Sequence, residues 1–116
     1  MNIEACYNKM GADYAEVKSR LPSDAFIKRF ALKFLDDPTF ALLEKSLTEE
    51  NVDEAFRAAH TLKGITQNLG FSQLSPLAIE ITEILRAGTM DGVDTLFPQL
   101  KEKYDMTVAC IKEVDE

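Results

Sequence analysis

Apolar residues that recur every three or four positions are the feature that most limits how this chain can fold, because that spacing matches one face of an α-helix. Such runs follow four sites: Pro22-Ser23, Asp37-Pro38, Asn51 and Ser75-Pro76. Serine, aspartate and asparagine favour the N-cap, and proline favours the first turn, so each site predicts the start of a helix. Glycine is common just past a helix end, and the last two of these helices are therefore expected to stop at Gly70 and Gly88.

The two ends of the chain continue this helical pattern. A final run is expected over residues 91–114, where Pro98 either kinks the helix or lies near its start. The first 22 residues predict two short helices separated around Gly11. We therefore expect an all-α fold in one domain over residues 1–116: an antiparallel four-helix bundle (23–114) with short additional N-terminal helices (1–22). The residues expected in its core are Phe30, Phe34, Leu43, Leu47, Leu62, Ile65, Leu69, Leu77, Ile81, Leu85, Leu100 and Ile111.

Composition and charge narrow the class of protein. With 116 residues, 46% of them hydrophobic, the chain is long enough to bury one core and is not expected to be disordered. The net charge of −7 argues against nucleic-acid binding, because most of the surface repels phosphates. No stretch approaches the ~18 apolar residues of a membrane span, and the first ten residues do not resemble a signal peptide. We expect a cytoplasmic protein whose two cysteines, Cys6 and Cys110, are buried thiols.

The chain has one histidine, His60, and helical geometry predicts that it faces solvent. At roughly 100° per residue, Ala58, Leu62, Ile65 and Leu69 fall close to the side of the helix that lies opposite His60. A lone histidine on a helix is more often structural than functional. A histidine that points away from the apolar stripe is not a core residue, however, and His60 is therefore our candidate for a reactive side chain.

The face around His60 combines residues that are unusual on a merely solvated helix. It holds Phe56, Arg57, Lys63, Gly64 and Gln67. Gly64 lies mid-helix, where glycine costs roughly 1 kcal/mol relative to alanine. Its bare backbone is expected to allow close approach by a partner or a phosphate, with tight packing against another helix as the alternative. Phe56 is a candidate docking anchor or an exposed aromatic without a role, and Lys63 and Arg57 are candidate anion-binding groups or ordinary solvated charges.

The segment His60-Thr61-Leu62-Lys63-Gly64, followed by Asn68-Leu69-Gly70 and Leu74, resembles the His-x-x-Lys-Gly motif and the downstream Leu-Gly of histidine-containing phosphotransfer (HPt) domains. The similarity covers about residues 23–114, and its specific motifs lie within residues 55–88. It implies a four-helix bundle on which His60 accepts a phosphoryl group from a receiver-domain aspartate and returns it to another. It also implies that Lys63 helps to neutralise the phosphate and that Gly64 clears space for docking. Ile65 and the pair Ile81-Thr82 depart from the family pattern, outside the implied phosphate site.

The resemblance predicts a phosphorelay intermediate and not an enzyme. The chain has no glycine-rich nucleotide loop, no phosphate-loop motif and no acidic cluster at metal-binding spacing around His60. We therefore expect no cofactor and no metal of its own, and any Mg²⁺ on the partner receiver. The expected partners are response-regulator receiver domains, with a hybrid histidine kinase as a further candidate, and neither nucleic acid nor a membrane. The alternative is a catalytically silent module that binds receivers without phosphoryl chemistry.

Overall fold

A computed structural model describes residues 1–115, and within them every regular element is an α-helix. The helices are α1 (Ile3–Lys9), α2 (Tyr14–Arg20), α3 (Asp24–Phe34), α4 (Thr39–Thr48), α5 (Val52–Leu69), α6 (Ser75–Arg86) and α7 (Val93–Lys112). The prediction of an all-α fold is therefore confirmed. The first two helices lie on either side of Gly11, as the sequence predicts, and α7 begins at Val93 and contains Pro98 near its start.

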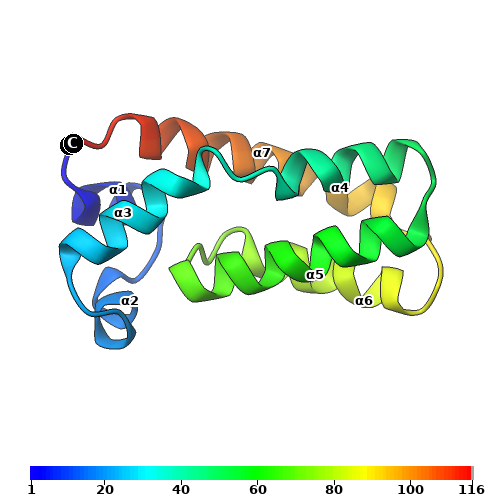
Figure 1. Cartoon of the computed structure of the whole chain (residues 1–116), viewed down its shortest axis with the longest axis horizontal. Coiled ribbons are helices and arrows are strands. Elements are labelled where there is room, and N and C mark those ends of the chain that lie inside the picture. The colour runs from blue at the N-terminus through cyan, green and yellow to red at the C-terminus, as the bar shows by residue number, and fades with distance from the viewer. Residues whose placement is uncertain (116) are drawn as a thin grey trace.

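Helices α4 to α7 form an antiparallel bundle in which each helix reverses the direction of the one before it (Figure 1). The first three helices, α1 to α3, gather at one end of this bundle, beside the C-terminal end of α7. The two ends of the chain meet there, because the Asp115 N–H donates to the Met1 carbonyl at 2.9 Å and the Met1 ammonium donates to the Glu113 carbonyl at 2.9 Å. The boundary between extension and bundle at residue 22 stays a prediction.

At two of the four predicted helix starts, the N-cap side chain accepts from an N–H group without a partner inside the helix, whereas the N-cap residues of α4 and α6 make no such bond. The Ser23 hydroxyl accepts a hydrogen bond from the N–H of Phe26 at 3.1 Å, and the Asn51 side chain accepts one from the N–H of Glu54 at 3.1 Å. The C-terminal end of α5 is closed by glycine, because Gly70 adopts a left-handed conformation with φ of 71°. Local sequence signals therefore set both ends of the helix that carries His60.

Side chains of the N-terminal helices donate hydrogen bonds to carbonyl groups at the C-terminal end of α5. The buried Tyr7 hydroxyl donates to the Leu69 carbonyl at 2.6 Å, and the Arg20 guanidinium donates to the Asn68 carbonyl at 3.1 Å. Both carbonyls belong to the last turn of the helix, where no backbone donor is available from the helix itself. Residues 1–22 therefore complete the end of α5 in addition to covering apolar surface.

Most of the predicted core residues are buried, and the exceptions are half-buried. The buried ones are Phe34, Leu43, Leu62, Leu69, Ile81, Leu85, Leu100 and Ile111. The half-buried ones, which pack against this core, are Phe30, Leu47, Ile65 and Leu77. Between α4 and α7 the space is filled by aromatic rings, with Phe40 stacked on Tyr104 and on Phe97 at centroid distances of 3.9 and 5.4 Å.

The two cysteines are buried and unpaired, as the sequence predicts. Cys6 lies in α1 and Cys110 in α7, two helices that contact each other. Burial raises the pKa of the Cys6 thiol to about 11, and the nearby Cys110 adds to this shift. At neutral pH Cys6 is therefore a protonated, unreactive thiol that contributes through packing.

We predict that Gly70→Ala destabilises the protein more than Gly88→Ala. Both glycines have a positive φ, of 71° and 82°, so alanine strains the backbone at either position. At Gly70 the added Cβ would also overlap the Cγ2 atom of the buried Val17, whereas at Gly88 it meets no atom within 4 Å. Chemical denaturation should show a loss of roughly 2–4 kcal/mol for Gly70→Ala and about 1 kcal/mol for Gly88→Ala. Equal losses would contradict a steric role for Val17.

Candidate functional site

Helix α5 positions His60 on its solvent-facing side. The helix is packed by α4 along one flank and by α6 along the other, and these are the most extensive contacts between helices in the fold. Ala58, Leu62 and Leu69 are buried on its inner side, whereas His60 is exposed. Because His60 lies in the middle of a long, capped helix, its backbone is held rigidly while its imidazole ring stays accessible.

The two flanks of α5 are not equally covered. On the side of α6, Ala59 and Thr66 are fully buried, and they face a helix that contributes the buried Ala78. Small side chains let two helix backbones approach closely. On the side of α4, Thr61 remains exposed. The open strip of α5 that contains His60 therefore extends toward α4.

Phe56 supports the imidazole from the side of α6. Its ring centroid lies 5.8 Å from that of His60, and the Arg86 guanidinium lies over its ring at 5.0 Å from the centroid. Phe56 is half-buried in this arrangement, so it is not the free aromatic that its position on the helical wheel suggests. Arg86 also pairs with Glu83, with Nε and Oε2 separated by 3.0 Å.

Arg86 is a residue of this site that helical spacing along α5 did not identify. It lies at the end of α6, far from His60 in the sequence, and only the packing of α6 on α5 brings it over Phe56. The exposed Leu42 of α4 was missed for a similar reason, because an apolar residue in an apolar run is expected to be buried. Its side chain is 52% exposed and borders a hollow of about 210 Å³ between α4 and α5, which Arg57 and Thr61 also line.

The cations near His60 differ in whether a carboxylate already neutralises them. Arg57 pairs with Glu54 one turn earlier, with Nη1 and Oε1 separated by 2.6 Å. Lys63 is half-buried, and no carboxylate of residues 1–115 lies within ion-pair distance of it. Lys63 is therefore the cation of this face that is free to pair with an arriving anion.

Gly64 leaves an opening one turn beyond His60. The residue is exposed, and a Cβ built on it would meet no atom within 4 Å outside the helix's own backbone. This geometry argues against tight packing, the alternative explanation for a glycine at this position. Gln67 is exposed as well, but it lies about two turns from His60, next to the contact between α5 and Arg20.

The chemistry available at this face is that of a nucleophile with charge neutralisation. A neutral imidazole has a free lone pair on one ring nitrogen, which can act as a nucleophile. Within the part of the chain that the structure describes, no three or more histidine, cysteine, aspartate or glutamate side chains are grouped so as to hold a metal ion. Nor is any of the described helices long and apolar enough to cross a membrane.

We predict that Gly64→Ala stabilises the fold. Alanine is the better helix former by up to about 1 kcal/mol, and the open space beside Gly64 accepts the methyl group without displacement. The midpoint and slope of chemical denaturation give the free energy of unfolding for both proteins. Gly88→Ala is the control that should not stabilise, because the φ of Gly88 is positive. A destabilised Gly64→Ala variant would mean that the glycine has a packing role.

Comparison with known proteins agrees with this geometry. A family model described as the Hpt domain matches residues 37–109, which include α4, α5, α6 and most of α7. The chemotaxis protein CheA of Halobacterium salinarum is 36% identical over 69 residues, which cover 57% of this chain but only 10% of that protein. No solved structure matches the chain. The motif around His60 lies within the matched region, and the chain belongs to the Hpt domain family, the phosphotransfer modules of two-component signalling.

Proposed function

We propose that this chain is a phosphorelay intermediate that accepts a phosphoryl group on His60 from the aspartyl phosphate of one receiver domain and passes it to another. The observation that carries the proposal is the exposure of His60 beside the open backbone of Gly64, on the side of α5 opposite its buried stripe. A side chain so placed can enter the acidic active site of a receiver without rearrangement of the bundle.

The proposed transfer balances without a cofactor in this chain. The unprotonated ring nitrogen of His60 attacks phosphorus in line, so that a nitrogen–phosphorus bond forms while the bond to the aspartyl oxygen breaks. The receiver regains a free carboxylate, and the second ring nitrogen of His60 carries the remaining proton. The return step is the reverse reaction with a different aspartate. Positioning and charge neutralisation are the main requirements of such a transfer.

Lys63 supplies the charge neutralisation in this proposal. It lies on the same face of α5 as His60 and has no carboxylate partner within residues 1–115, whereas Arg57 and Arg86 are each paired with a glutamate. Phe56 restricts the imidazole from one side, which reduces the number of rotamers that must be ordered on docking. Any Mg²⁺ would be held by the receiver.

The proposal includes receiver domains as partners, a hybrid histidine kinase as a further partner, and a location in the cytoplasm. The alternative is a silent module that binds receivers without accepting a phosphoryl group. The two differ in a single observable, the acid-labile phosphohistidine. The presence of an exposed nucleophile, His60, on the same face as the unpaired Lys63 and the open Gly64 favours the relay, because a module that only docks does not need a nucleophile there.

The test of the proposal compares the wild type with His60→Gln as phosphoryl acceptors. The donor is a receiver domain whose aspartate has been phosphorylated with a small-molecule acyl phosphate. We expect acid-labile phosphate on the wild type and none on His60→Gln, with circular dichroism and unfolding free energy nearly unchanged, because His60 is exposed. Phosphate that persists on His60→Gln would overturn the assignment. A wild type that binds charged receivers but is never phosphorylated would identify the silent module.

Replacing Lys63 by alanine should slow transfer by about tenfold with little effect on stability. The loss follows from removing the unpaired cation beside the doubly charged phosphoryl group. Rapid-quench transfer from the charged receiver measures the rate. Lys112→Ala, at the C-terminal end of α7, removes the same charge at a distance and should leave the rate unchanged. Equal rates for both variants would assign Lys63 to the solvated surface.

A further inference from the structure

Helix α3 presents a cluster of aromatic rings and cations, which we define as Phe26, Arg29, Phe30 and Lys33 and call the α3 face. The two phenylalanine rings lie 4.5 Å apart. The Arg29 guanidinium lies 5.7 Å from one ring centroid and 5.3 Å from the other, and the Lys33 ammonium lies 5.1 Å from the centroid of Phe30. The rings are half-buried, so the cations above them form the outer surface of this helix.

The α3 face is positive on an acidic protein. The chain carries a net charge of −7, whereas α3 contains three basic residues and only one acidic residue. Within residues 1–115, Arg29 is the one arginine of four that has no carboxylate within 4.0 Å, and Lys33 has none either. These cations are available to a carboxylate from outside the chain.

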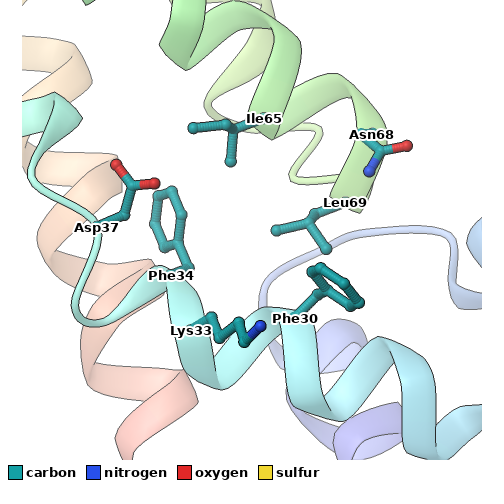
Figure 2. A pocket seen from close by; sticks show the side chains of 7 residues that line it. All are labelled: Phe30, Lys33, Phe34, Asp37, Ile65, Asn68 and Leu69. Carbon is teal, nitrogen blue, oxygen red and sulfur yellow. The ribbon is translucent and has the colours of Figure 1, made fainter.

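A groove of about 230 Å³ adjoins the α3 face, and its two long walls come from different helices (Figure 2). Phe30 and Phe34 of α3 lie on one side, and Ile65 and Leu69 of α5 lie on the other. The Lys33 side chain, which also lines the groove, runs along α3 toward Phe30. Pockets for drug-sized ligands measure roughly 300–1,000 Å³, so this groove suits one or two apolar side chains.

The polar residues at the edge of the groove are compatible with an acidic occupant. Asp37 is the one acidic residue of the lining, and its carboxylate accepts a hydrogen bond from the N–H of Thr39 at 2.8 Å. That hydrogen bond holds the negative charge of Asp37 at the N-terminal end of α4, where the helix dipole favours it. Lys33 and Asn68 leave an ammonium group and an amide at the opening.

The groove depends on a helix outside the matched family region. The Hpt model covers residues 37–109, so the wall from α5 belongs to it and α3 does not. Along α5, Ile65 and Asn68 lie about 8–12 Å beyond His60 at 1.5 Å per residue. A segment bound in this groove would therefore hold the rest of its protein close to His60.

We infer that the α3 face and its groove bind an acidic segment of a partner protein, with one large apolar side chain in the groove and carboxylates on Arg29 and Lys33. Charge complementarity selects this occupant, because a short acidic segment meets only the basic α3 face. A second copy of this chain, with its net charge of −7, or an anionic membrane would bring a large negative surface against the acidic remainder of the protein. The apolar part is also recessed between helices, whereas a membrane-binding helix exposes its apolar side chains. The binding does not depend on chemistry at His60.

The experiment uses the synthetic peptide acetyl-EDEFLDE-amide and follows amide chemical shifts of the isotope-labelled protein by NMR. We expect saturable changes confined to α3 and residues 65–69, with millimolar affinity that falls as salt screens the charges. A peptide with alanine in place of its phenylalanine and leucine should not bind. His60→Gln should bind like the wild type, so failure of the phosphorelay proposal leaves this result unaffected.

Charge-reversal variants then test whether Arg29 and Lys33 bind the peptide. The double variant Arg29→Glu, Lys33→Glu should bind at least about tenfold more weakly. Lys45→Glu, an exposed lysine of α4 without an ion pair among the described residues, is the matched control and should bind normally. Arg29→Leu keeps apolar contact with the rings and should still weaken binding. Absence of saturable shifts, shifts spread over other helices, or binding to phosphatidylserine vesicles in place of the peptide would overturn the inference.

Discussion

The packing of α5 between α4 and α6 is the constraint on which the site depends. Burial of Ala58 and Leu62 on one side of a single helix determines the rotation of that helix about its axis, and the rotation places His60 in solvent. Because each residue of an α-helix is fixed at roughly 100° from the next, one residue cannot move to another side of the helix without rotating the whole helix. Fully buried Ala59 and Thr66 hold α5 against α6 and leave the flank toward α4 open.

Ion pairs on the surface decide which charges the site can use, although they add little to stability. Glu54 neutralises Arg57, and Glu83 neutralises Arg86, so two of the guanidinium groups near His60 are already occupied. Lys63 is left as the free cation beside the imidazole. The same reasoning applies to α3, where Arg29 lies over aromatic rings and not beside a carboxylate. In an acidic protein, an unpaired cation marks a place where an anion from another molecule is favoured.

Helix α5 also joins the site to the N-terminal helices. Its C-terminal carbonyls accept hydrogen bonds from Tyr7 and Arg20, and its Ile65 and Leu69 side chains form one wall of the groove against α3. The end of α5 that carries these contacts lies about two turns from His60. The first three helices therefore stabilise the helix that carries His60 and extend the surface that a partner would meet.

Much of this protein was determined by local features of the sequence. N-cap residues such as Asn51 and the stop at Gly70 define α5, and its apolar spacing is sufficient to orient His60, because these effects act within a few turns of one helix. Spacing within one helix carries no information about its neighbours, however. Only the tertiary structure placed Arg86 over Phe56, left Leu42 exposed and opened the groove beside α3, because these depend on how separate helices approach each other.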